Sequence, residues 1–196
     1  MGGVTLNTIR ITTPLNEKKI SNLKAGDRVL ISGDVYTARD AAHIKLREML
    51  KDNVNLPFNI EGAILYYVGP TPTPPGKIIG SAGPTTSTRM DDLTPLLMNL
   101  GLLGMIGKGD RSDKVVDLIK KKGAVYFAAI GGAGALISKS IIESQIIVFP
   151  ELGTEAIRWL KVKDFPVIVA IDSQGVNLYK TGPANYNTKK SHKPSY

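Results

Sequence analysis

Residues 102–130 read LLGMIGKGDRSDKVVDLIKKKGAVYFAAI, and this stretch decides the fold class. The apolar run from Leu102 to Ile106 predicts a short strand, and a helix is expected from about Ser112 to Lys122. A second apolar run, from Ala124 to Ile130, predicts another strand. Strand, helix and strand in this order are typical of two parallel strands joined by a helix. We therefore expect an α/β protein with a mainly parallel sheet.

Similar patterns lie on both sides of this unit. Further strands are expected at Val4–Ile11, Arg28–Ile31, Gly62–Val68, Ser140–Phe149 and Phe165–Ile171. Helices are expected at 41–51 and from Met90 to Leu100, while residues 151–163 fit a helix or a strand equally well. The proline-dense residues 69–76 predict a stiff connecting loop.

The composition indicates one globular, turn-rich unit, with 42% apolar residues, 20 glycines and 12 prolines among 196 residues. We expect a single domain over residues 1–182 and a basic tail over residues 183–196. Apolar runs stay short of the roughly 18 residues that a membrane helix requires, and the N-terminus lacks the pattern of a secretory signal.

Cysteine is absent, and the two histidines are His43 and His192. This composition excludes disulfides, thiolate catalysis, and any zinc or iron–sulfur site ligated by thiolates of this chain. It fits a cytoplasmic location. The formal net charge of +8 admits an anionic small molecule, an acidic protein or a nucleic acid as partner. Because the charge is scattered and lacks interleaved aromatic residues, nucleic acid ranks below the other two.

Three junctions between predicted strands and helices carry a cation, namely Arg39, Arg89 and Lys108. Ligands of parallel α/β sheets bind beyond the carboxyl ends of the strands, where helix N-termini add polarised N–H groups. A single cation there is more often a solvated surface charge, but repetition at equivalent junctions favours a binding site. The expected ligand is a small molecule with two carboxylates, or a phosphate.

The sequence also predicts how the helices at these junctions begin. Thr37 and Asp40, Thr88 and Asp91, and Asp110 and Asp113 each have the spacing of a capping box. Asp91 is accordingly expected to cap a helix instead of ionising for catalysis.

Gly83–Asp91, with the sequence Gly-Pro-Thr-Thr-Ser-Thr-Arg-Met-Asp, crowds four hydroxyl side chains beside Arg89. Capping does not require Thr85 or Thr86, so both are free to face a ligand. Threonine is a poor base alone, but adjacent cations stabilise its deprotonated form. His43 lies inside a predicted helix and is interpreted as a structural or interface residue.

Two glycine-rich segments could in principle bind phosphate, Gly107–Gly109 and the run from Gly132. Gly107-Lys108-Gly109 is not a Walker loop, because position 102 is Leu and Gly109 replaces the required Ser or Thr. The run from Gly132 fails the dinucleotide pattern, because position 137 is Ile. Both comparisons argue against nucleotide binding.

Four segments together resemble the β subunit of iron–sulfur (class I) fumarate hydratases, a chain type shared with L(+)-tartrate dehydratase. These are Gly33–His43, Gly83–Asp91, Gly107–Gly109 and Phe165–Val167. The resemblance extends over nearly the whole chain. It implies a swivelling β/β/α fold, in which a mainly parallel sheet is backed by a smaller antiparallel one.

The resemblance also implies a partner and roles for the candidate residues. The partner would be an α subunit whose three cysteines hold a [4Fe–4S] cluster, in an α2β2 assembly. Arg39, Arg89 and Lys108 would bind the substrate carboxylates. Thr85 would be the base, with Thr86 as the alternative. Asp91 and His43 would be supporting residues.

Three functions remain open. The first is reversible interconversion of (S)-malate with fumarate and water. The second is dehydration of L(+)-tartrate to oxaloacetate, because the same cations would bind either four-carbon dicarboxylate. The third is a noncatalytic basic module that binds RNA or an acidic protein, for which Thr85 and Arg89 would be dispensable.

Overall fold

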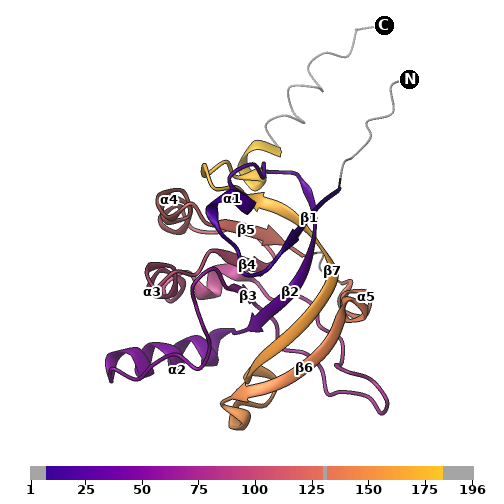
Figure 1. Cartoon of the computed structure of the whole chain (residues 1–196). Coiled ribbons are helices and arrows are strands. Elements are labelled where there is room, and N and C mark those ends of the chain that lie inside the picture. The colour runs from indigo at the N-terminus through magenta and orange to yellow at the C-terminus, as the bar shows by residue number, and fades with distance from the viewer. Residues whose placement is uncertain (1–7, 130–131, 183–196) are drawn as a thin grey trace, which may run out of the picture.

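A computed structural model of the chain describes residues 8–129 and 132–182 (Figure 1). Its elements in chain order are β1 (Thr8–Thr12), α1 (Glu17–Ile20), β2 (Arg28–Thr37), α2 (Asp40–Lys51), β3 (Ile64–Tyr66), the 3₁₀ helix η1 (Ser87–Met90), α3 (Thr94–Asn99), β4 (Gly104–Gly107), α4 (Asp113–Lys122), β5 (Val125–Ala128), α5 (Gly134–Ile137), the 3₁₀ helix η2 (Ser138–Ser140), β6 (Ile141–Val148), the 3₁₀ helix η3 (Pro150–Glu155) and β7 (Ile157–Ile171). The expected basic tail lies outside the described residues.

The seven strands belong to one sheet with the order β1-β2-β3-β4-β5-β7-β6. Neighbours from β1 to β5 are parallel, whereas β7 runs antiparallel to β2, β5 and β6. Because β7 pairs with β2 as well as with β5, strands β2, β3, β4, β5 and β7 close into a barrel. The fold is thus mixed α/β, with helices on the flanks of the barrel.

The expectation of a smaller, separate antiparallel sheet is wrong for the described residues. The reason is the length of β7, which has 15 residues. Its first half pairs with β6, its second half pairs with β5, and β2 pairs along both halves. A single long strand therefore joins the antiparallel and parallel parts into one sheet.

The protein has two hydrophobic cores, one inside the barrel and one between the barrel and the helices, because successive side chains of a strand point to opposite faces. On and next to β3, Ile64, Tyr66 and Val68 point into the barrel, whereas Leu65 and Tyr67 point toward the helices. Figure 1 shows α2, α3 and α4 along one flank of the barrel, with α5 on the other flank. Because both faces of β3 are buried, its sequence is continuously apolar, as is usual for central parallel strands.

The helix expected from Met90 to Leu100 is divided. Residues 87–90 form η1, and α3 begins only at Thr94. Pro95 explains the late start, since a proline lacks the N–H of a helix interior and fits the first turn. In the part of the chain that the structure describes, no helix has the length and apolar character needed to cross a membrane.

Candidate functional site

The loop that contains Thr85 lies across the carboxyl ends of β3 and β4. The Thr85 N–H donates to the Tyr67 carbonyl at 2.8 Å, and the Thr85 carbonyl accepts from the Lys108 N–H at 3.1 Å. The Ser87 N–H in turn donates to the Lys108 carbonyl at 2.9 Å. These bonds place the threonine loop and the Lys108 loop side by side, although more than twenty residues separate them in the sequence.

Asp40 brings the two arginines together. Its carboxylate accepts from Arg89 Nε at 2.9 Å through one oxygen and from Arg39 Nε at 3.3 Å through the other. Asp40 is the first residue of α2, so the amino end of this helix lies beside the threonine loop. The structure therefore gathers Arg39, Arg89 and Lys108 at one edge of the barrel. Their role in binding stays a prediction.

The two arginines differ in how much of their binding capacity is already used. Arg39 is 21% exposed, and its guanidinium also pairs with Glu155 at 3.2 Å. The Arg89 side chain is 50% exposed, and its ion pair to Asp40 runs through Nε, at the base of the guanidinium. Among the residues that the structure describes, neither Nη group of Arg89 has a hydrogen-bond partner, so both can form a bidentate pair with a carboxylate.

The remaining candidate groups are also accessible from outside. Thr85 is half-buried, while Thr86 and Lys108 are exposed. Lys108 follows directly on β4, and Thr86 forms a parallel bridge with it. An anion that reaches this edge would meet a hydroxyl, an ammonium group and a guanidinium within one short stretch of surface.

The capping box predicted for α2 does not form. The Thr37 hydroxyl donates to the Ala156 carbonyl and accepts from the Arg158 N–H, so it is turned away from the helix. Glu155 caps α2 instead, accepting the Ala41 N–H at 2.8 Å. The same carboxylate holds Arg39, which explains how an arginine is tolerated at the positive end of a helix.

The assignments of Asp91 and of the pair Asp110 and Asp113 to capping boxes are also wrong. Asp91 Oδ1 accepts from Arg111 Nε at 2.6 Å, and Oδ2 accepts from the Ser112 N–H at 2.6 Å. Asp110 Oδ1 accepts from Asn177 Nδ2. The N-cap residue of α4 is Ser112, and its side chain makes no capping hydrogen bond. Asp91 thus links the end of η1 to the start of α4.

Arg111 is a buried residue that the sequence interpretation missed. Its side chain has no exposed area, and it donates to Asp91, to the Thr94 hydroxyl at 3.1 Å and to the Tyr67 hydroxyl at 3.3 Å. Its guanidinium also lies 5.3 Å from the centre of the Tyr126 ring. In sequence, Arg111 looks like any surface arginine before a helix, because its partners lie up to 44 residues away.

His43 is buried behind the arginines and does not face the site. Its Nδ1 lies 3.1 Å from the Arg39 carbonyl, and its ring meets the Tyr67 ring edge-on at 5.6 Å between centroids. Burial lowers the pKa of His43 to about 4, so the ring is neutral near pH 7. A neutral Nδ1–H donates to the Arg39 carbonyl, which supports the interpretation of His43 as a structural residue.

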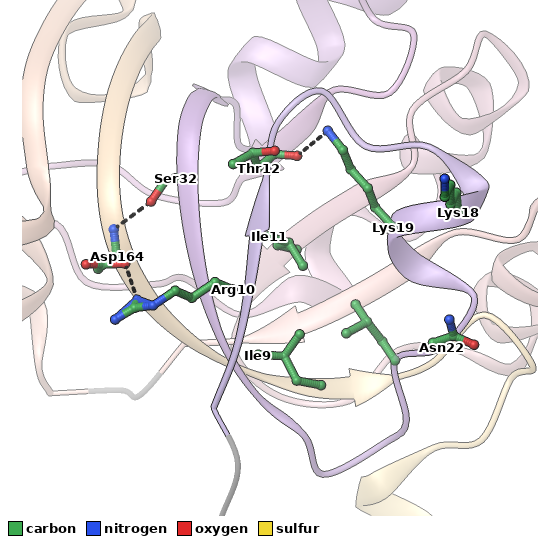
Figure 2. Close-up of a pocket in the computed structure, with 10 residues that line it drawn as sticks. Ile9, Arg10, Ile11, Thr12, Lys18, Lys19, Asn22, Ser32 and Asp164 are labelled. Atoms are coloured by element: carbon green, nitrogen blue, oxygen red, sulfur yellow. Dashed lines mark hydrogen bonds and ion pairs between the residues drawn. The ribbon is translucent and has the colours of Figure 1, made fainter.

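A cavity of about 460 Å³ lies elsewhere, between β1 and α1 (Figure 2). Two of its three cations, Lys19 and Arg10, already have partners, and the third is the exposed Lys18. Lys19 Nζ donates to the carbonyls of Thr12 and Pro14, and Arg10 pairs with Asp164 at 2.8 Å. We therefore place the candidate site at the Arg39–Arg89–Lys108 edge and not in this cavity.

Known proteins resemble the chain over most of its length. A family model described as "Fumarase C-terminus" matches residues 3–182. "Putative L(+)-tartrate dehydratase subunit beta" of Methanocaldococcus jannaschii is 40% identical over 172 residues, which cover 85% of this chain and 88% of the relative. "Fumarate hydratase 2" of Leishmania major is 39% identical over 164 residues, which cover 83% of this chain and 29% of the relative.

"Fumarate hydratase class I, aerobic" of Escherichia coli strain K12 is 36% identical over 176 residues, which cover 88% of this chain and 32% of the relative. The chain thus spans less than a third of these two fumarate hydratases but most of the tartrate dehydratase subunit. The family expected from the four sequence segments is confirmed, and the chain belongs to the fumarase C-terminus family.

Proposed function

We propose that the chain is the β subunit of a two-subunit hydro-lyase that interconverts (S)-malate with fumarate and water. The observation that carries this proposal is the gathering of Arg39, Arg89, Lys108 and Thr85 at one edge of the barrel. The family relationship supports it, because the relatives carry the names of enzymes that act on four-carbon dicarboxylates.

The cations suit a substrate with two carboxylates. The exposed Nη groups of Arg89 can bind one carboxylate in a bidentate pair, and Lys108 supplies a second, more flexible positive charge. Arg39 is held by Asp40 and Glu155, so it offers a charge in a fixed position. The positive charge that these three side chains bring to the surface would attract both carboxylates of such a substrate.

Thr85 is assigned the role of base. It would take the proton from the carbon next to the hydroxyl-bearing carbon, while the cations stabilise its deprotonated oxygen and the negative charge that develops on the substrate. Both backbone groups of Thr85 are hydrogen-bonded, so its position is fixed relative to Lys108. Thr86 is exposed and is the alternative base.

This chain does not supply ligands for the implied [4Fe–4S] cluster. It has no cysteine, and among residues 8–129 and 132–182 no three His, Asp or Glu side chains are grouped to hold a metal ion. The donor set therefore does not fit the cluster, which we assign to the α subunit. The proposal includes an α2β2 assembly, a cytoplasmic location and swivelling of residues 1–182 as one domain against that subunit.

Dehydration of L(+)-tartrate is the second candidate reaction. The observation that favours it is the coverage of the relatives. The chain spans 88% of a protein named as a tartrate dehydratase subunit, but only 29% and 32% of the fumarate hydratases. The same coverage also supports a separate β subunit for the malate reaction.

The two reactions are distinguished by turnover of the reconstituted complex. The chain would be mixed with a cysteine-bearing α subunit from the same source, and kcat/KM would be measured for (S)-malate, fumarate and L(+)-tartrate. Preference for malate and fumarate supports the main proposal, and preference for tartrate supports the second. Activity with none of the three would contradict both.

The noncatalytic alternative requires a different measurement. A basic RNA-binding module would shift RNA in a gel, and its affinity would fall steeply as salt increases. That affinity would be unchanged by Thr85→Val or Arg89→Ala. RNA binding of this kind, together with an inactive complex, would replace the enzymatic proposal.

A further inference from the structure

The proposed reaction depends on the spacing of two separate loops. Residues 84–91 carry Thr85 and Arg89, and residues 107–112 carry Lys108. The backbone bonds between Thr85, Ser87 and Lys108 join these loops at their edges. A third segment, β5, joins them from below through one side chain.

That side chain is Tyr126. Its hydroxyl oxygen lies 2.8 Å from Ser87 Oγ in the first loop and 2.8 Å from the Gly109 carbonyl in the second. A carbonyl can only accept, so the Tyr126 proton is donated to Gly109. Ser87 Oγ must then be the donor toward Tyr126. The chain of bonds therefore runs in one direction, from Ser87 through Tyr126 to Gly109.

Two of these three groups are enclosed, whereas Gly109 is part-buried. Ser87 and Tyr126 are both fully buried, and a Cβ added at Gly107 would lie 1.9 Å from Ser87 Oγ. Any side chain at position 107 would therefore clash with Ser87, so glycine is required there. Burial raises the pKa of the Tyr126 hydroxyl above its ordinary value, so the hydroxyl remains a neutral donor at all physiological pH values.

The Tyr126 ring is held in place by its surroundings, which keeps its hydroxyl between its two hydrogen-bond partners. The Arg111 guanidinium lies 5.3 Å from the ring centre, and Arg111 in turn holds Asp91 at the end of η1. The ring is thus fixed by packing, and its hydroxyl reaches both loops at once. Removing that hydroxyl would leave the Ser87 donor unpaired inside the protein and would remove the bond that ties the part-buried Gly109 carbonyl to β5, which would favour separation of the loops.

From this geometry we infer that Tyr126 is a positioning residue for the hydro-lyase reaction. Acting through Ser87 and Gly109, its hydroxyl reinforces the backbone bonds that set the distance between Thr85 and Lys108. This inference rests on the proposed function, because it assumes that the reaction uses both loops. Tyr126 itself lies beneath the loops and does not touch the substrate.

Tyr126→Phe is the first test, made in the reconstituted complex. A misplacement of about 1 Å can cost roughly a hundredfold in rate. We expect kcat for (S)-malate to fall by about tenfold or more and KM to change by less than about threefold. The split is expected because the long side chains of Arg89 and Lys108 can follow a bound carboxylate, whereas the short threonine cannot.

Ser87→Ala tests the direction of the hydrogen-bond chain. It removes the donor to Tyr126 but leaves the bond from Tyr126 to Gly109, so its effect on kcat should be smaller than that of Tyr126→Phe. The double variant should be no slower than Tyr126→Phe alone, because both changes break the same connection. Multiplicative effects would show that the two residues act independently.

Tyr36→Phe is the matched control. The Tyr36 ring stacks on that of Phe58 with 4.3 Å between centroids, and its hydroxyl makes no hydrogen bond with the residues that the structure describes. The same chemical change should therefore leave kcat and KM at wild-type values. Melting temperatures of all variants would show whether the folded fraction is equal.

Hydrogen exchange of the full chain provides a measurement that does not depend on activity. In Tyr126→Phe, peptides covering residues 84–91 and 107–112 should exchange faster than in wild type, while residues 28–37 of β2 should be unchanged. An inactive wild-type complex would remove the proposed function but would leave this expectation intact. A Tyr126→Phe complex with wild-type kcat and unchanged exchange in both loops would overturn the inference about Tyr126.

Discussion

Arg89 is a candidate site residue whose side chain remains accessible to a ligand. Its Nε pairs with Asp40, and half of its side-chain surface remains accessible. Exposed ion pairs contribute at most about 1 kcal/mol to stability, whereas a charge-assisted hydrogen bond to a substrate is worth about 1.5–3 kcal/mol. The loss of Arg89 should therefore affect binding and catalysis far more than folding.

Arg89→Ala in the reconstituted complex is expected to lower kcat/KM for (S)-malate by roughly ten- to a hundredfold. The melting temperature should stay close to that of wild type. Arg10→Ala is the control, since Arg10 is also an exposed arginine paired with an aspartate but belongs to β1, away from the candidate site. If Arg89→Ala unfolds the chain and activity follows the folded fraction, Arg89 is structural.

His43 should make stability depend on pH. Burial lowers its pKa from 6.5 to about 4, so between these values the unfolded chain binds a proton that the folded chain does not. The stabilisation is complete above pH 6.5 and is lost as the pH falls toward 4. The difference corresponds to roughly 3 kcal/mol.

Urea denaturation of the full chain at several pH values between 7 and 4.5 would measure this effect. The free energy of unfolding should decrease with falling pH in wild type and should decrease less steeply in His43→Gln. The contribution of the carboxylates to this pH dependence is the same in both proteins, so it cancels in the difference between them. Equal slopes would indicate that His43 titrates in the folded chain as it does in the unfolded one.

At the scale of elements, the amino end of α2 depends on a side chain from η3. Glu155 accepts the Ala41 N–H and pairs with Arg39, although 114 residues separate Glu155 from Ala41. Loss of a helix cap costs about 1 kcal/mol. The same loss would release Arg39, so the cap also fixes a cation of the candidate site.

Glu155→Ala should therefore lower the free energy of unfolding by about 1 kcal/mol and raise KM for (S)-malate. Urea denaturation and steady-state kinetics measure the two effects. Glu151→Ala, at an exposed position of the same 3₁₀ helix, should change stability by less than about 0.5 kcal/mol. Equal stabilities of the two variants would argue against the capping role of Glu155.

Elements were predictable where the signal is local. The strands around Gly62–Val68 and Leu102–Ile106 and the helix ending at Lys122 are found where buried apolar runs placed them. All three predicted capping boxes are wrong, because the capping and pairing partners come from distant segments. Spacing within four residues cannot reveal that Glu155 reaches Ala41.

The parts of the site that could not be predicted from the sequence depend on contacts between residues far apart in the chain. The three cations were predictable from their repeated positions after strands. The roles of Asp40, which bridges the two arginines, and of Arg111, which is buried and holds Asp91, were not predictable, since each acts through contacts that only the folded chain creates. The closure of the barrel by β7 has the same origin.

At the scale of the whole molecule, closure of the barrel holds the candidate site in a fixed frame. β2 leads to Arg39, β4 leads to Lys108, and the threonine loop lies between β3 and β4. The side chains that it presents can bind carboxylates and move a proton, but they do not include ligands for an iron–sulfur cluster. The proposed reaction would therefore require a second chain that holds the cluster.

Titration of this chain into a fixed amount of the cluster-bearing α subunit tests that requirement most directly, with malate formation from fumarate as the readout. The account predicts no activity from either chain alone and a rise to a plateau at equimolar β and α. The Thr85→Val chain should bind the α subunit equally well but restore little activity. Substantial activity from either purified chain alone, or full activity with Thr85→Val, would contradict the account.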